Sequence, residues 1–276
     1  MRSAALVFTL SWLAVAGVAQ EVAPPAPIAP IVVQVRTKVA GEKAPRVDRD
    51  GKECPGVMWR GRELEWRIGD GAPLRTPKAL ARALAVKAKD PATRLPDPRA
   101  PGEQILPPVE VDLGDDVRWA EVLAIWDAVH GAGFDAFRFA GLKAPASIAV
   151  EAQAVDDPVV GGGALVVPKC EFHRSLPFPW QLGQPTFDVF EDGHIVCRTF
   201  SGEPDVFDDL RRSLAHLRGI LKKKTGVPSS LPLIVRADKW ARWSDVRQLI
   251  EVAAAPEFGN RTFWLAVTEL EYEGSR

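Results

Sequence analysis

Asp238 occupies a position at which an acidic side chain either performs chemistry or stabilises a turn. It directly follows the apolar run 233–237, and apolar residues take up helical spacing a few positions later. A catalytic aspartate needs a second titratable group and a pocket that shifts its pKa, whereas a structural one accepts hydrogen bonds from the amides of the turn. The sequence shows no Ser–His pattern and no paired acids at informative spacing. We therefore expect the structural role for Asp238 and predict no catalytic residues.

Two of the three cysteines lie near histidines. Cys170 and His173 form a C-x2-H pair, and His194 and Cys197 form the mirrored pair, so the ligand types suit a tetrahedral zinc site. If 194–197 is a strand, however, residues three apart point to opposite faces and do not converge on one ion. We therefore predict no metal and no cofactor. A disulfide between Cys170 and Cys197 is the preferred expectation, and two buried thiols are the alternative.

The bulk composition describes an ordinary globular chain. It has 276 residues, is 46% hydrophobic and carries 35 basic against 36 acidic residues. Near-neutral charge provides no general attraction to nucleic acid, so we predict that nucleic acid is not a partner. Three cysteines are too few for a disulfide framework. Any partner must be recognised through a local surface.

The first 19 residues resemble a secretory signal, because an uncharged apolar run follows Arg2 and small residues precede Gln20. A Pro-rich tether is expected over 20–44, since closely spaced prolines favour extended chain. A linker is expected over 143–163, which has no clear periodicity and ends in three glycines. These breaks leave two folded segments, 45–142 and 164–276. We expect a periplasmic or secreted protein, or a membrane-anchored one if the signal is not cleaved.

The two segments contain an internal repeat. Residues 107–129 align without a gap on 231–253, and the alignment matches Trp119 with Trp243 and Arg118 with Arg242. Each copy is predicted to contain a hairpin, a helix, a strand, a second helix and a final strand. Asp-Gly turns mark the hairpins at 47–53 and 189–197. The paired tryptophans are expected in the core.

A strand ending in Ala237-Asp238-Lys239, followed by an aromatic residue, a helix and a final strand, resembles the periplasmic domain of the ExbD/TolR family of biopolymer-transport proteins. The segment 187–197 is similar to the opening hairpin of that family. The resemblance implies an α+β fold of two tandem small domains, each with a mixed sheet and two helices. The family's motor proteins carry an aspartate in a membrane helix, and 3–19 contains no acidic residue. The resemblance therefore implies a relative without the motor's own chemistry.

The resemblance also implies an exported, non-enzymatic interaction module. Its expected partner is an envelope protein, an energy-transducing protein or peptidoglycan, and the oligomeric state is left open. Alternative functions are a small periplasmic hydrolase or metal-dependent enzyme, and a membrane-anchored accessory subunit of an energy-transducing complex. Binding is expected at a sheet edge beside a Pro-aromatic loop. The candidate binding residues are Trp180, Phe187, Val189, Ile195 and Asp238.

Overall fold

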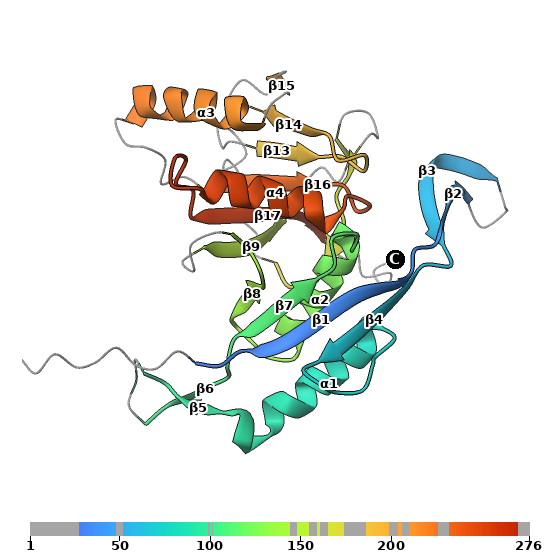
Figure 1. Cartoon of the computed structure of the whole chain (residues 1–276), viewed down its shortest axis with the longest axis vertical. Helices are drawn as coiled ribbons and strands as arrows, with labels where there is room; N and C mark the ends of the chain where they lie inside the picture. Colours follow the sequence, from blue (N-terminus) through green and yellow to red (C-terminus); the bar gives the residue numbers. More distant parts are fainter. Residues whose placement is uncertain are drawn as a thin grey trace, which may run out of the picture.

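Each half of the chain forms a mixed β-sheet with two long helices, as the computed structural model shows (Figure 1). The fold is therefore α+β, as predicted. The structure describes residues 28–47, 52–98, 100, 102–143, 148–154, 159–160, 165–173, 186–198, 204–205, 210–225 and 232–269. The predicted signal segment and Trp180 lie outside these residues. Within the described ranges, no helix combines the length and apolar character needed to span a bilayer.

The first sheet has the strand order β4-β1-β7-β8. Strand β1 pairs antiparallel with β4 and parallel with β7, and β7 pairs parallel with β8. Two helices form the connections, and α1 begins at a Thr76 cap with Pro77 in its first turn, as predicted. The bounds are β1 Ile31–Val39, β4 Glu63–Ile68, α1 Pro77–Lys89, β7 Val109–Leu113, α2 Trp119–Gly131 and β8 Phe137–Phe139. A short helical turn at Pro91–Thr93 and the small β5–β6 pair, Leu95–Pro96 and Gln104–Ile105, precede β7.

The second sheet repeats this arrangement as β14-β13-β16-β17 and extends it at both sides. Its hairpin, β13–β14, is antiparallel, and β16 and β17 follow in parallel. The bounds are β13 Thr186–Val189, β14 Ile195–Arg198, α3 Leu210–Thr225, β16 Leu233–Ala237, α4 Trp243–Ala254 and β17 Thr262–Glu269. The added strands are β9 Ala149–Ala154 and β12 Lys169–Cys170 beside β17, and β15 Pro204–Asp205 beside β14. Strands β10 (Val159–Val160) and β11 (Leu165–Val166) form a separate two-stranded sheet.

The internal repeat is visible in the structure. Strands β7 and β16 begin 124 residues apart, and so do helices α2 and α4. The predicted order of a strand followed by a helix is therefore confirmed at both places. The sheet order of hairpin, middle strand and last strand is also the same in both halves.

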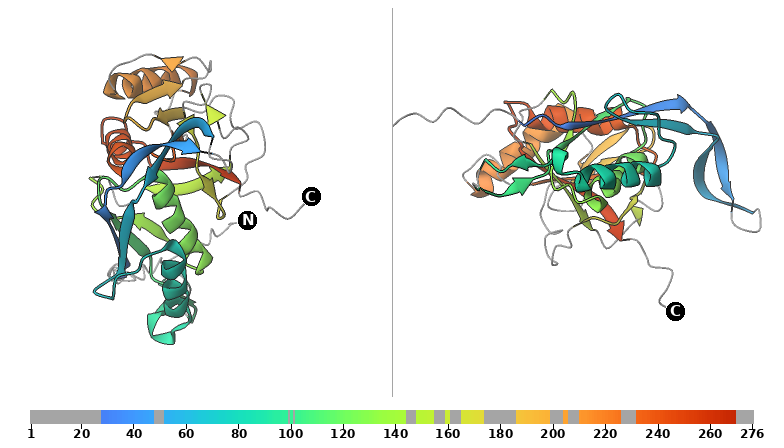
Figure 2. Two further views of the ribbon diagram at one scale, coloured as in Figure 1. Left: turned by 90° about the vertical axis from the view of Figure 1, so that its right-hand side faces the viewer. Right: turned by 90° about the horizontal axis from the view of Figure 1, so that it is seen from below.

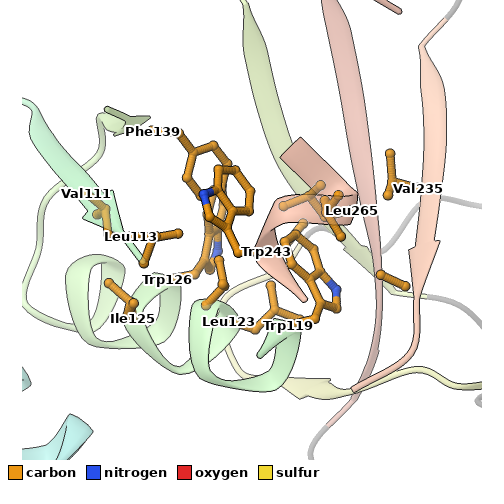
Figure 3. Packing of buried hydrophobic residues seen from close by; sticks show 14 of the residues in the cluster. Val111, Leu113, Trp119, Leu123, Ile125, Trp126, Phe139, Val235, Trp243 and Leu265 are labelled. Carbon is orange, nitrogen blue, oxygen red and sulfur yellow. The ribbon is translucent and has the colours of Figure 1, made fainter. Parts of the chain in front are cut away.

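One hydrophobic cluster runs through both halves. It extends from Val33 in β1 to Val267 in β17 and includes most of helix α2. Figure 3 shows Trp119 and Trp126 of α2 on the side of the helix that faces Trp243, while Val111 lies on β7 at the left of the view. Trp119 and Trp243 are 0% and 1% exposed, so their predicted core placement is confirmed. The two halves share a core and do not bury separate ones.

Two of the predicted boundaries are wrong. The expected tether, 20–44, contains β1, in which buried Val33 and Val35 alternate with exposed residues in the middle of the first sheet. The expected linker, 143–163, contains β9, which pairs with β17 over six residues. Strand β9 is half alanine, with Ala152 in the core cluster and Val150 packed against it. Neither strand was predicted, because a proline-rich stretch precedes β1 and a glycine-rich stretch follows β9.

The predicted hairpin at 47–53 is not the counterpart of β13–β14. Strands β2 (Glu42–Val47) and β3 (Glu53–Arg60) form a two-stranded arm inserted between β1 and β4. Figure 1 shows this arm projecting to one side of the sheets, and the right-hand view of Figure 2 shows the same projection. Such a ribbon is only marginally stable alone. Contacts at the base of the arm therefore matter for its position.

The sequence also predicts that Asp205 caps a helix whose apolar face includes Leu210 and Leu214, and this cap is wrong. Asp205 lies in β15, and α3 begins at Leu210. Strand β15 pairs with the outer edge of β14 at Cys197. The acidic residue therefore belongs to a strand that partly closes the sheet edge.

Candidate functional site

The two halves meet through reciprocal hydrogen bonds at the starts of α2 and α4. The amide of Trp119 donates to the carbonyl of Ala241 over 2.9 Å, and the amide of Trp243 donates to Val117 over 2.7 Å. The amide of the next residue in each helix also donates to a carbonyl of the other half. Ala120 donates to Lys239, and Ser244 donates to Asp115. The amides of a helix's first turn have no partner inside the helix, so each half completes the helix start of the other.

These four bonds have the symmetry of a dimer interface within one chain. Every donor and acceptor maps onto its counterpart when the sequence number is shifted by 124, as in an isologous contact between identical subunits. At the centre, Arg118 and Arg242 form an isolated antiparallel bridge. The starts of two helices, and therefore the positive ends of two helix dipoles, converge beside these arginines.

Arg118 is held in an unusual environment for a charged side chain. It is only 4% exposed, and its guanidinium lies 4.3 Å from the centre of the Trp59 ring. One terminal nitrogen donates to the carbonyl of Trp240 over 2.7 Å, while Nε is buried without a partner among the described residues. Burial first, and then the charges of Arg62 and Arg242, lower the pKa of Arg118. A nearby anion would relieve both the desolvation and the like-charge repulsion.

A cavity of about 730 Å³ lies beside this bridge. Arg118 and Arg242 contribute to its lining, together with Lys43 of β2. Arg242 is exposed, and it makes no ion pair or hydrogen bond through its side chain with any other described residue. Within the described part of the chain, the cavity therefore contains one buried cation with an unused donor and one cation whose side chain has no hydrogen-bond or ion-pair partner.

The turn of the β13–β14 hairpin forms the opposite wall. Glu191 and Asp192 of this turn line the cavity, and Glu191 pairs with Lys43 over 3.1 Å. Asp192 accepts a hydrogen bond from the amide of His194, and Gly193 has a φ of 86°, which favours glycine. The predicted Asp-Gly turn is therefore confirmed. The Lys43–Glu191 pair ties the arm of the first half to the hairpin of the second.

The remaining lining is aromatic and apolar. Trp59 of β3, Phe190 and Val196 border the cavity beside the charged groups. The indole Nε1 of Trp59 is buried without a hydrogen-bond partner among the described residues. A buried donor without an acceptor is costly, by about 1 to 3 kcal/mol. The lining thus offers apolar surface together with unused donors.

A buried ion pair fixes the base of the arm. Arg62, whose side chain is 6% exposed, donates from Nε to Glu121 of α2 over 2.8 Å. Another nitrogen of Arg62 donates to Thr37 and to the carbonyl of Asp116. Glu121 also accepts from the amide of Arg118 over 2.7 Å. The same carboxylate therefore positions the arm, the start of α2 and the backbone of the cavity arginine.

Asp238 has the structural role predicted for it. It is 5% exposed, and its two carboxylate oxygens accept from the amides of Trp240 and Val166, each over 2.7 Å. Burial, which outweighs these hydrogen bonds, raises the pKa of Asp238. Its carboxylate stabilises the turn that leads to Arg242 and does not reach the cavity lining.

The other predicted binding residues do not form a free sheet edge. Phe187 and Val189 are fully buried on β13, which pairs with β14 on one side and with β16 on the other. Ile195 is half-buried on β14 and packs against the core cluster. Cys197 and Arg198, the last two residues of β14, pair with β15. The alternation of β-forming residues indicated a strand, but it could not show that this strand is central.

The expected disulfide is wrong, because Cys170 and Cys197 are both buried thiols that form no disulfide, which was the alternative. Cys170 lies on β12 and Cys197 on β14, with β17, β16 and β13 between them. Four strand spacings separate the two cysteines by roughly 19 Å, whereas a disulfide requires Cα atoms within about 7 Å. The Cys170 thiol instead donates to Asp127 of α2 over 3.0 Å. Burial, followed by the hydrogen bond and charge of Asp127, raises the pKa of Cys170.

Metal ligation is not suggested by the described side chains. Among them, no group of three or more His, Cys, Asp and Glu residues is placed to hold an ion. The mirrored Cys–His pairs lie on different strands of the second sheet or next to them, so they do not converge.

Comparison of the chain with protein-family models, curated proteins and solved structures finds no match. The fold and the site themselves define an α+β protein with an internal repeat. Its two halves together line an open cavity with cationic and aromatic side chains where they meet.

Sequence reasoning missed this site, although one signal for it was present. The repeat alignment matched Arg118 with Arg242, two positively charged residues directly before the two matched tryptophans. An arginine at both equivalent positions of a divergent repeat indicates that the two residues have the same role. The alignment could not identify the site, because nothing in the sequence shows that the two copies face each other at these arginines.

Proposed function

We propose that this protein is a non-enzymatic interaction module of the cell envelope, related to the periplasmic domain of the ExbD/TolR family. Its partner is an envelope protein, an energy-transducing protein or peptidoglycan. The observation that carries the proposal is the cavity at the Arg118–Arg242 bridge, because it combines unused donors with aromatic surface. Such a combination is typical of recognition sites.

The state of the reactive groups supports binding over catalysis. The Asp238 carboxylate is occupied by two backbone amides. The raised pKa of Cys170 keeps its thiol protonated, and a thiol is a poor nucleophile compared with a thiolate. Neither group lines the cavity. The groups that do line it are suited to holding a charged partner.

The family relationship is supported by the order of elements. Both halves contain a hairpin, a helix, a strand, a helix and a final strand, which is the order that the resemblance implies. Export is supported by the apolar run 3–19 and the small residues before Gln20. A chain delivered to the envelope would place the cavity where envelope partners are present.

Affinity capture from an envelope extract, combined with sedimentation on purified peptidoglycan, tests this function. The bait is the folded protein beginning at Gln20, and the matched baits are Arg242→Glu and Arg67→Glu. Arg67 is an exposed arginine on β4, away from the cavity. We expect a partner that is retained by the parent protein and by Arg67→Glu but lost with Arg242→Glu. Equal retention by all three baits, or by none, would contradict binding through this cavity.

A further inference from the structure

We propose that the cavity at the Arg118–Arg242 bridge is a binding site for the free carboxylate at the end of a peptide chain whose last side chain is apolar. This proposal rests on the proposed function and names the chemistry that its site recognises. Three features support it: the free donors of Arg118, the charge balance of the lining, and the apolar surface beside the charges.

The guanidinium of Arg118 has the free edge that a carboxylate needs. One terminal nitrogen already donates to Trp240, and Nε lacks a partner among the described residues. Arginine binds carboxylates through two parallel N–H groups, and such pairs are stronger and more directional than those of lysine. The cation–π contact with Trp59 and the hydrogen bond to Trp240 both restrain the guanidinium. The donor is therefore oriented before the ligand arrives, which lowers the entropic cost of binding.

The charges of the lining favour a monoanion. Arg118, Arg242 and Lys43 carry positive charge, while Glu191 and Asp192 carry negative charge. With His194, which also lines the cavity, counted as neutral, three cations against two carboxylates leave an excess of one positive charge, which a single carboxylate neutralises. A phosphate dianion would reverse the sign of the site and would approach Glu191 and Asp192 with twice the charge. The lining thus matches a carboxylate better than a phosphate.

The shape and composition of the walls favour the end of a chain. The arm, the β13–β14 turn and the arginine bridge are three separate segments that border one cavity of about 730 Å³. This volume is typical of sites that enclose a small ligand. Trp59, Phe190 and Val196 provide the surface for an apolar side chain next to the carboxylate. A peptide terminus presents both groups on one residue.

Isothermal titration of the folded protein with short probes tests the proposal. The probes are N-acetyl-Leu-Leu with a free carboxylate, the same dipeptide as its C-terminal amide, N-acetyl-D-Ala-D-Ala and inorganic phosphate. We expect the free Leu-Leu acid to bind at least 10-fold more tightly than each of the others, since hydrogen bonds to a charged group contribute strongly. Equal binding of the acid and the amide would overturn the carboxylate assignment. Tighter binding of the D-Ala-D-Ala probe would overturn the contact of a large apolar side chain with Trp59, Phe190 and Val196, and tighter binding of phosphate would overturn the peptide carboxylate.

Variants locate the binding to the cavity. Arg242→Gln removes an exposed arginine without a described partner, so we expect it to fold normally and to weaken binding of the Leu-Leu acid about 10-fold. Arg118→Lys keeps the charge but loses the two-pronged donor, and we expect a loss of at least the same size. Arg67→Gln is the matched control and should bind like the parent protein. Unchanged binding by a folded Arg242→Gln would overturn the site.

Failure of the ligand assignment and failure of the proposed function give different results. If the envelope capture depends on Arg242 but the Leu-Leu acid does not bind, the ligand assignment is wrong and the interaction module stands. If the acid binds through the cavity but no envelope partner depends on Arg242, the site is correct and the envelope function is wrong.

Discussion

Arg118 and Arg242, which occupy equivalent positions in the repeat, face each other in an antiparallel bridge between the two halves of the chain. Around them, each half supplies carbonyl groups for the first amides of the other half's helix. The contact is of the kind that a symmetric dimer makes between subunits. Because one core and one set of caps serve both halves, we expect the halves to depend on each other for stability.

Replacement of Trp119 by Ala tests this dependence. The side chain is fully buried at the junction, so its loss should lower the free energy of unfolding by about 3 to 5 kcal/mol. Val86→Ala, at a 70% exposed position of α1, should change the same quantity by less than about 0.5 kcal/mol. Chemical denaturation followed by both fluorescence and circular dichroism measures the effect. Two separate transitions, only one of them shifted, would show that the halves unfold independently.

The ion pair at the base of the arm should contribute more than an exposed pair. Arg62→Ala leaves the partly buried Glu121 without its partner, and such a loss typically destabilises by about 3 kcal/mol or more. Arg67→Ala breaks an exposed pair with Glu65 and should cost less than about 1 kcal/mol. Denaturant midpoints of the two variants provide the comparison. Similar midpoints would mean that the buried pair has no special role in holding the arm.

Removal of the Asp238 carboxylate should destabilise the turn before α4. Asp238→Ala leaves the amides of Val166 and Trp240 without acceptors, and we expect a loss of about 2 kcal/mol in the free energy of unfolding. Asp70→Ala, at an exposed position, is the control and should have little effect. The measurement is urea denaturation at neutral pH. An unchanged midpoint for Asp238→Ala would contradict the structural role.

The effect of Asp238 should also depend on pH. Burial raises its pKa in the folded protein, so the folded state binds the proton more tightly than the unfolded state. This contribution to stability is fully present below the ordinary aspartate pKa of 3.8 and is lost as pH rises through the folded-state pKa. The difference in unfolding free energy between the parent protein and Asp238→Ala should therefore shrink from pH 3 towards neutral pH. A difference that grows over this range would show that the pKa is lowered instead.

Cys170 and Cys197 should form no disulfide and should be unreactive in the folded protein. Cys170 and Cys197 are buried, and the raised pKa of Cys170 disfavours its thiolate. In a Cys54→Ser background, a thiol reagent at neutral pH should modify neither residue until denaturant is added, and mass spectrometry should then find two labels. A cross-linked Cys170–Cys197 peptide under non-reducing conditions would contradict the strand order of the second sheet.

Local sequence patterns were sufficient for much of the fold. The cap at Thr76 and the strand–helix pairs of both repeats follow from spacing and capping residues. The burial of Trp119 and Trp243 and the role of Asp238 also followed from their positions. The cap and the strand–helix pairs depend on neighbours in the chain, so the sequence alone determined them, whereas the partners of Trp119, Trp243 and Asp238 include residues far along the chain.

The tertiary structure decided which segments pair and where the two halves meet. The alternation at Val33 and Val35 marks a strand, but its position in the middle of a sheet depends on β4 and β7, which lie far along the chain. The same holds for β9, for the separation of Cys170 from Cys197 and for the burial of Phe187. The hydrophobic pattern of a strand shows that it is a strand, but it does not show which distant strand it pairs with. The cavity depends on such pairing most of all, because its arginines, its arm and its turn become neighbours only when the two copies face each other.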